Sequence, residues 1–256
     1  MKKPVSFKTI GFDLLWVQLT WTFWFLGIML LINIGKLIFQ ADVDSFYISG
    51  YIASNIYMLI IGIIAIYFLP YYVENGISRK NYFLGNIIAS IGLSIIIPIL
   101  IYLLSLLESL VASSLSPAIL IERVFEQVVV DIDGHPLAEV ILSFILTPFV
   151  NPETNLILSL AVFSLHIYVF YLIGWLIGSA FYRLGVIGGL VFIVIGIALN
   201  AVKDSMLRLA LDLPLFQSFS ALDIVPVNLA IPLVFVIILI TLILIRLLTK
   251  RAAIKM

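Results

Sequence analysis

The fold is decided by an uninterrupted apolar run in the second hydrophobic segment, Ile61-Gly62-Ile63-Ile64-Ala65-Ile66-Tyr67-Phe68-Leu69. This run is continuously apolar. The strands of a membrane barrel instead alternate polar and apolar residues. The run belongs to a longer stretch, residues 45–73, that contains no Asp, Glu, Lys or Arg. An α-helix needs roughly 20 residues to cross a bilayer, so this stretch predicts a membrane-spanning helix.

Five further stretches share this length and this lack of charge: 14–35, 81–107, 154–182, 184–202 and 224–245. The whole sequence is 63% hydrophobic and 11% charged. Soluble domains have about 25% charged residues, so the composition excludes an ordinary soluble protein. We therefore expect an all-α membrane protein, a single transmembrane domain over residues 1–256 with six transmembrane helices.

Charged residues are distributed unevenly between the two sides of this predicted bundle. With six crossings, both termini and the connections after the second and fourth helices lie on one side. That side holds Asp13, Glu74 and the basic residues Lys2, Lys3, Lys8, Arg79, Lys80, Arg183, Arg246, Lys250, Arg251 and Lys255. Basic residues concentrate on the cytoplasmic side of membrane proteins. We expect cytoplasmic termini in a multi-pass protein of the plasma membrane.

Several segments lie outside the predicted spans. Residues 1–13 are basic and partly amphipathic, and we expect a cytoplasmic interfacial segment; the alternative is a tail whose lysines only set the topology. Residues 111–153 are expected to be extracellular, with short amphipathic helices over 118–130 and 137–150 joined by a turn. Residues 203–223 form a second predicted extracellular segment that begins with a short helix.

Three local patterns predict how neighbouring helices meet. Pro70 lacks an amide donor, which predicts a kink or the end of the second helix just before the polar connection. Gly174 and Gly178 form a small-residue face at i, i+4 spacing, which favours close helix packing. The short connection 181–185 predicts an antiparallel hairpin of the fourth and fifth helices, with Arg183 at the inner interface.

Residues that could support catalysis are sparse in this chain. His135 and His166 lie on different elements, so the paired ligands of a metalloprotease are missing. We expect His166 to be a neutral, hydrogen-bonded interior histidine. The turn at 131–136 lacks the closing Glu of a calcium loop, and no G-x-x-x-x-G-K-[ST] phosphate loop occurs. Charged residues are expected almost entirely at the ends of the helices, unlike in an ion-coupled carrier. We expect no enzyme activity, bound metal or cofactor, and no nucleic-acid partner.

The connection between the second and third predicted helices reads Asn75-Gly76-Ile77-Ser78-Arg79-Lys80-Asn81-Tyr82-Phe83. The fourth and fifth are joined by Leu176-Ile177-Gly178-Ser179-Ala180-Phe181-Tyr182-Arg183-Leu184-Gly185. Both passages, and the amphipathic segment before the first helix, resemble the membrane subunits of ABC-2-type ABC transporters. The resemblance covers the whole predicted topology.

The resemblance implies a docking element for a separate cytoplasmic ATPase, because in that family a short coupling helix follows the second span. By this similarity the docking residues are Glu74, Asn75, Gly76, Ile77, Ser78, Arg79, Lys80, Asn81 and Tyr82. Arg79 and Lys80 would pair with acidic groups, and Ile77 or Tyr82 would pack into the ATPase groove. Arg183 would be a secondary cytoplasmic contact. The alternative is that Arg79 and Lys80 are only topology charges beside a turn at Asn75 and Gly76.

The function implied is that of a permease subunit in an ABC exporter for an amphiphilic substrate such as a peptide or a lipid. ATP and Mg²⁺ would be bound by the ATPase subunits. A second permease subunit, identical or different, would complete the transporter within the membrane lipid. The alternative is an accessory or immunity-type membrane protein that binds a partner or a peptide without transporting it.

Overall fold

The computed structural model describes residues 6–39, 45–115, 139, 143–144 and 147–253, and among these it contains helices but no β-strand. Five helical stretches are long and apolar enough to cross a membrane. They are α1 (Phe7–Ile38), α2 (Phe46–Ala65) with its continuation to Glu74, α4 (Arg79–Leu115), α6 (Leu156–Ala210) and α7 (Val227–Thr249). The prediction of an all-helical chain suited to a membrane is confirmed.

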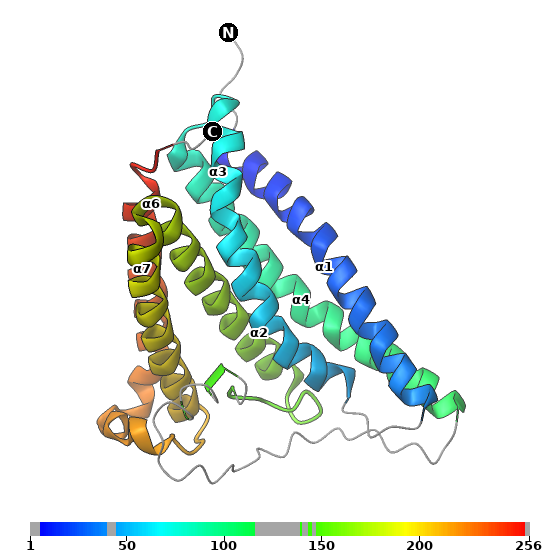
Figure 1. The fold of residues 1–256 in the computed structure, drawn as a ribbon. Helices are drawn as coiled ribbons and strands as arrows, with labels where there is room; N and C mark the ends of the chain where they lie inside the picture. The colour runs from blue at the N-terminus through cyan, green and yellow to red at the C-terminus, as the bar shows by residue number, and fades with distance from the viewer. Residues whose placement is uncertain (1–5, 40–44, 116–138, 140–142, 145–146, 254–256) are drawn as a thin grey trace.

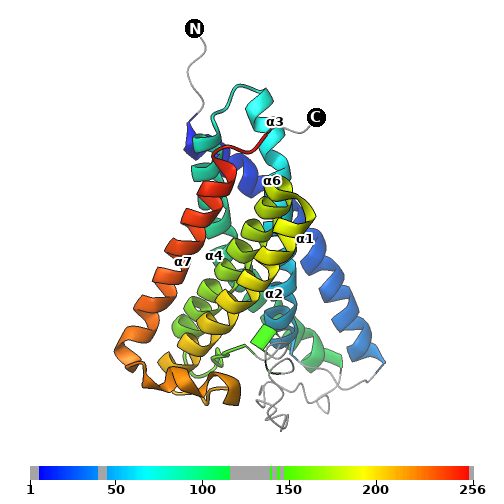
Figure 2. The ribbon, with the colours of Figure 1, turned by 60° about the vertical axis from the view of Figure 1, so that its left-hand side comes forward.

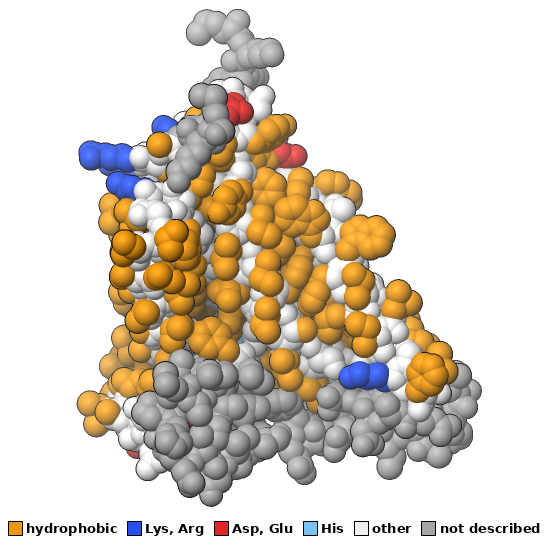
Figure 3. Space-filling view, in the orientation of Figure 1, with side chains coloured by type: hydrophobic (Ala, Val, Ile, Leu, Met, Phe, Trp, Pro, Cys, Tyr) orange, Lys and Arg blue, Asp and Glu red, His pale blue; other side chains and the backbone are white. Residues whose placement is uncertain are grey.

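The bundle has a hydrophobic flank, as expected of helices that face lipid. Large apolar side chains cover its surface between the two ends (Figure 3). On α1, the exposed fractions of Trp16 and Trp24 are 70% and 71%. Lipid tails solvate such side chains, whereas water would not. These exposures support the assignment as a multi-pass membrane protein.

The longest helix, α6, is two helices joined at a glycine. Gly185 has φ 76° and ψ −165°, a conformation that side-chain-bearing residues rarely adopt. The chain reverses there, and the two arms run back along each other (Figures 1 and 2). A Cβ at Gly196 on the second arm would lie 2.8 Å from Ile173 on the first. The predicted antiparallel hairpin at 181–185 is confirmed.

The second predicted helix is interrupted near Pro70, as the sequence indicated. α2 ends at Ala65, the 3₁₀ turn η1 (Ile66–Phe68) follows, and the short helix α3 (Leu69–Glu74) completes the stretch. Pro70 occupies the first turn of α3. Amides in that turn have no intrahelical acceptor, so proline costs nothing there. The change of helix type therefore falls just before the polar connection.

α2 and the first arm of α6 approach each other closely enough for their backbones to touch. A Cβ added at Gly174 would lie 2.1 Å from the carbonyl oxygen of Leu59, and one at Gly178 would lie 2.3 Å from that of Ile63. From the other side, a Cβ at Gly62 would lie 2.1 Å from the carbonyl oxygen of Tyr171. The predicted small-residue face is confirmed, and Gly62 extends it to α2.

The remaining helices pack around this pair. α1 lies along α4, α4 also contacts α2 and α6, and α7 packs on α6. The start of α1, the α3–α4 connection, the Gly185 reversal and the end of α7 all lie at one end of the bundle, at the top of Figures 1 and 2. We call this the basic end. We call the other, where α2, α6 and α7 begin, the acidic end.

The segments outside the predicted spans differ in part from expectation. Residues 7–13 are the first turns of α1, which continues without a break to Ile38, so they are not a separate interfacial helix. The predicted helix at 118–130 and the turn at 131–136 lie outside the described residues. Of the predicted helix at 137–150, residues 147–150 are not helical. Residues 203–210 continue α6, and the 3₁₀ helix η2 (Gln217–Ile224) follows.

Candidate functional site

The residues singled out by the sequence, 74–82, form the end of α3, a tight turn and the first turn of α4. The amide of Gly76 donates to the carbonyl of Val73, and that of Ile77 donates to the carbonyl of Tyr72, both at 3.0 Å. These bonds, with Gly76 at φ 79°, make a Schellman turn at the end of α3. Glycine adopts a positive φ without steric cost, so Gly76 determines where α3 ends.

Ser78 begins the next helix two residues later. Its Oγ accepts a hydrogen bond from the amide of Asn81 at 3.1 Å, and its carbonyl accepts one from the amide of Tyr82 at 3.0 Å. This is the N-cap arrangement that satisfies free amides at the start of a helix. The connection is therefore a capped turn between two helices, and its shape is fixed by its own residues.

Exposure divides the predicted docking residues into two groups. Glu74, Asn75, Gly76, Ser78 and Lys80 are exposed, whereas Ile77, Arg79 and Asn81 are half-buried. Tyr82 is fully buried, with its hydroxyl group donating to the carbonyl of Ala65. A partner could therefore reach the turn and Lys80 directly, but Tyr82 packs within this chain and does not offer its ring to a partner.

Arg183 and Arg246 bind backbone groups at the basic end. The guanidinium of Arg183 donates to the carbonyls of Leu247 and Leu248, which lie in the last turn of α7. These carbonyls lack intrahelical donors, and cations are favourable at a helix C-terminus. Arg246 donates to the carbonyl of Arg79 at 3.3 Å. The Gly185 reversal and the start of α4 are thus both connected to α7.

The basic end presents a positively charged surface beside the α3–α4 turn. Lys80, Arg183, Lys250 and Arg251 are exposed. Blue basic side chains gather at this end in Figure 3, where red acidic side chains also appear. The surface suits a partner with acidic groups, because complementary charge orients two proteins as they meet.

Two charged residues that follow the fifth predicted span are buried within α6. Lys203 and Asp204 are 0% and 1% exposed, although the sequence placed both in an extracellular segment. Nζ of Lys203 lies 2.7 Å from Nδ1 of His166, on the other arm of the hairpin. The predicted hydrogen bond of His166 is confirmed, with a partner the sequence did not identify. One signal in the sequence could have indicated this contact. His166 and Lys203 lie about equally far from Gly185, so an antiparallel hairpin that turns at Gly185 brings them side by side.

Asp204 and Arg208, one turn apart on α6, form a buried ion pair. Nε of Arg208 donates to Oδ2 of Asp204 at 2.8 Å, and Nη1 donates to the carbonyl of Pro214 at 3.2 Å. The guanidinium also lies over the ring of Phe216, 4.2 Å from its centroid. A buried ion pair needs such additional hydrogen bonds, because removing both charges from water is costly. Arg208 thereby holds the chain that follows α6.

A neutral polar cluster joins three helices nearer the middle of the bundle. The hydroxyl of Tyr171 donates to Oδ1 of Asn86 at 2.9 Å. Nε2 of Gln18 donates to the same hydroxyl oxygen at 3.2 Å. All three side chains are buried. Since α1, α4 and α6 each contribute one residue, the cluster links these three helices at one level of the bundle.

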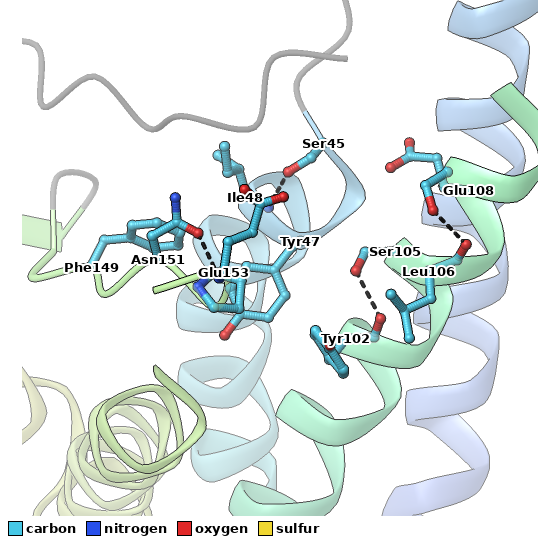
Figure 4. Close-up of a pocket in the computed structure, with 12 residues that line it drawn as sticks. Ser45, Tyr47, Ile48, Tyr102, Ser105, Leu106, Glu108, Phe149, Asn151 and Glu153 are labelled. Carbon is cyan, nitrogen blue, oxygen red and sulfur yellow. Dashed lines mark hydrogen bonds between the residues drawn. The ribbon is translucent and has the colours of Figure 1, made fainter. Parts of the chain in front are cut away.

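A pocket at the acidic end has a volume of about 200 Å³. It is bounded by the start of α2, the C-terminal part of α4 and residues 149–153 (Figure 4). Oε2 of Glu108 accepts a hydrogen bond from the amide of Phe46 at 2.6 Å, and Oε1 accepts one from Asn33. In Figure 4, Glu108 and Glu153 stand on opposite sides of the pocket. Glu108 is thus structural, because it caps α2 and binds α1.

No group of three or more His, Cys, Asp or Glu side chains within the described residues could hold a metal ion. Searches against protein-family models, curated proteins and solved structures found no match to this chain. The features that bear on function are therefore the geometry of the basic end and the resemblance in its sequence.

Proposed function

We propose that the chain is the membrane-spanning permease subunit of an ATP-driven ABC exporter, and that the α3–α4 turn docks its ATPase. In this proposal α6 crosses the membrane twice and the other four long stretches cross once, giving six crossings. Each arm of α6 exceeds the roughly 20 residues required. The basic end, with the start of α1 and the end of α7, faces the cytoplasm because positive residues favour that side of the plasma membrane.

The observation that carries the proposal is the rigid, exposed turn at the basic end. Its backbone hydrogen bonds at Gly76 and Ile77 fix its shape before any partner arrives. A preformed surface loses less conformational entropy on binding than a flexible loop does. Glu74 and Lys80 are exposed on either side of it and offer both signs of charge to a partner. Such a turn suits repeated docking and release.

The connections of the turn to the bundle support a role in transmitting motion. α3 continues through η1 into α2, and α2 touches the backbone of α6 at Gly62, Gly174 and Gly178. On its other side the turn leads directly into α4. A force applied to the turn would therefore reach two long helices at once. This arrangement suits a subunit that is driven from outside the membrane.

The remaining parts of the transporter lie in other subunits under this proposal. ATP and Mg²⁺ bind to the ATPase, and a second permease subunit, identical or different, completes the membrane part. The cargo is proposed to be amphiphilic, a peptide or a lipid. The exposed apolar flank keeps this chain in contact with membrane lipid.

Copurification tests the docking proposal. Tagged protein extracted in mild detergent is expected to carry an ATPase subunit, identified by mass spectrometry and by ATP hydrolysis. Lys80→Glu reverses an exposed charge at the turn, and we expect about a tenfold loss of bound ATPase, or about 1.4 kcal/mol. Lys36→Glu is the matched control, because Lys36 is exposed near the opposite end of the bundle. It should retain the ATPase.

The accessory or immunity-type alternative predicts a different result. If the tagged chain never retains an ATP-binding subunit, and Lys80→Glu leaves its cellular function intact, the transporter proposal is overturned. Equal loss of ATPase with Lys80→Glu and Lys36→Glu would overturn the docking site, because a local contact cannot respond equally to charges at both ends.

A further inference from the structure

The two arms of the α6 hairpin are joined by a pair of buried nitrogen bases. Nζ of Lys203 on the second arm lies 2.7 Å from Nδ1 of His166 on the first, and both residues are 0% exposed. The pair lies toward the open end of the hairpin, far along the arms from Gly185. This hydrogen bond therefore joins the two arms far from the turn that connects them.

The chemistry of this bond limits how many protons the pair can hold. A hydrogen bond needs a lone pair on one of its two nitrogens. When Lys203 is an ammonium, Nδ1 of His166 must be the acceptor and the imidazole proton must be on Nε2. The next proton can then bind only to Nδ1, the acceptor atom itself. Once it does, both nitrogens are donors and positively charged, and the bond is lost.

The surroundings of the pair favour one positive charge over two. Tyr51 on α2 stacks on the imidazole, with ring centroids 5.9 Å apart, and Nζ of Lys203 lies 5.0 Å from the ring centroid of Phe170. Asp204 and Arg208 are the charged neighbours on the second arm, and both interact electrostatically with Lys203. Oδ2 of Asp204 binds Arg208, so that carboxylate already has a counter-charge.

The pair also contains a polar atom without a partner. Nε2 of His166 is buried and makes no hydrogen bond within the described residues. A buried imidazole N–H without an acceptor is energetically unfavourable. The wider neighbourhood is polar as well: the amide of Asn200 donates to the carbonyl of Ser143 at 3.4 Å. The Lys203 contact is therefore the hydrogen bond that orients this imidazole within the described residues, and a proton on Nδ1 removes it.

We propose that His166 and Lys203 form a proton-binding site, in which uptake of a proton by Nδ1 of His166 breaks the bond between the arms and lets them separate. The proton comes from the aqueous phase at the acidic end, and the site gains one positive charge when it binds. The site belongs to the hairpin itself and does not depend on an ATPase, so it goes beyond the proposed transporter function.

The chain allows a direct test, because it has only two histidines and no cysteine. His135→Gln leaves His166 as the sole histidine, whose two ring nitrogens can be followed by ¹⁵N NMR in lipid nanodiscs between pH 8 and pH 5. Spin labels on Leu158→Cys and Val202→Cys, both at exposed positions, report the distance between the arms. We expect Nδ1 to change from an acceptor to an N–H over the same pH range in which the labels move apart.

Three variants separate this proposal from a structural role. Lys203→Met removes the neighbouring charge, so His166 should bind its proton at higher pH and the label distance should no longer depend on pH. His166→Asn should abolish the pH dependence of the distance. Lys36→Met, at an exposed lysine on α1, should change neither curve.

Two results would overturn the proposal. One is that His166 keeps the same protonation state from pH 8 to pH 5. This measurement requires no substitution at His166 or Lys203. The other is a label distance that changes with pH in the same way after His166→Asn. Retention of the ATPase is a separate measurement, so either site can fail without the other.

Discussion

Individual buried charges in this chain join segments that are far apart in sequence. Glu108 on α4 accepts hydrogen bonds from Asn33 on α1 and from the amide of Phe46 at the start of α2. From the sequence alone, Glu108 marks only the end of an apolar run. Its partners could not be predicted, because they depend on which helices pack together. The same is true of Lys203 and His166, which lie on different arms of α6.

Replacement of Glu108 should lower the stability of the whole bundle. Glu108→Ala leaves the amide of Phe46 buried without an acceptor, which costs about 1–3 kcal/mol. Thermal unfolding in detergent, followed through the fluorescence of the four tryptophans, measures the loss. Glu74→Ala, at an exposed position on the basic end, is the control and should unfold as the wild type does. An unchanged unfolding temperature for Glu108→Ala would show that the cap is dispensable.

Substitutions at Tyr82 and Lys80 should have different effects, the first on the stability of the protein and the second on its binding of the ATPase. Tyr82→Phe removes the buried hydroxyl that donates to Ala65, so we expect a loss of about 1 kcal/mol in unfolding free energy. Its retention of an ATPase should stay at the wild-type level, because the ring does not reach the surface. Lys80→Glu should behave in the opposite way. If Tyr82→Phe lost the partner while remaining as stable as the wild type, the ring would have a role in docking.

At the scale of helices, the sequence predicted most of the fold because hydrophobicity is a local property. Each apolar run found in the sequence lies mostly within helices, and Pro70 and Gly174 indicated a break and a close contact. The end of α6 was missed for the same local reason. Lys203, Asp204 and Arg208 read as a solvated segment, yet they pair with groups inside the protein. A sequence does not distinguish a buried charged residue from an exposed one, because burial depends on partners elsewhere in the fold.

The contact between α2 and α6 gives a prediction at this scale. Gly174→Ala would place a methyl group 2.1 Å from the carbonyl oxygen of Leu59, so the two helices must move apart. We expect about 3 kcal/mol of destabilisation, the upper range for overpacking. Gly27→Ala on α1 is the matched control, since a Cβ there meets nothing within 4 Å. Unfolding in detergent measures both, and equal stability would contradict the close contact.

The whole molecule can be oriented with single cysteines, because the wild-type chain contains none. Glu153→Cys precedes α6 and Asp223→Cys follows it, so an α6 that crosses twice puts both on one side. We expect a membrane-impermeant maleimide to label these two in intact cells. Lys80→Cys and Lys250→Cys should react only after permeabilisation. Labelling of 153 and 223 from opposite sides would mean that α6 crosses once.

The packing of the helices could be predicted from the sequence less completely than the helices themselves. Charge bias groups the basic residues at one end, and the structure places the beginning of α1 and the end of α7 together there. The polar cluster of Gln18, Asn86 and Tyr171 could not be anticipated. Each is a single polar residue in an apolar run, and only the packing of three helices brings them together.

The glycine contact between α2 and α6 also has a consequence for biogenesis. α2 is synthesised early, but the surface that fits Gly62 belongs to a helix that leaves the ribosome much later. A helix is stable alone in lipid, because its backbone hydrogen bonds are internal. α2 can therefore remain inserted in the bilayer before α6 is synthesised. α1 and α4 can already pack against each other at that stage. We expect the docking of α2 on α6 to be a late step of assembly, and nascent chains that end before Gly174 to lack it.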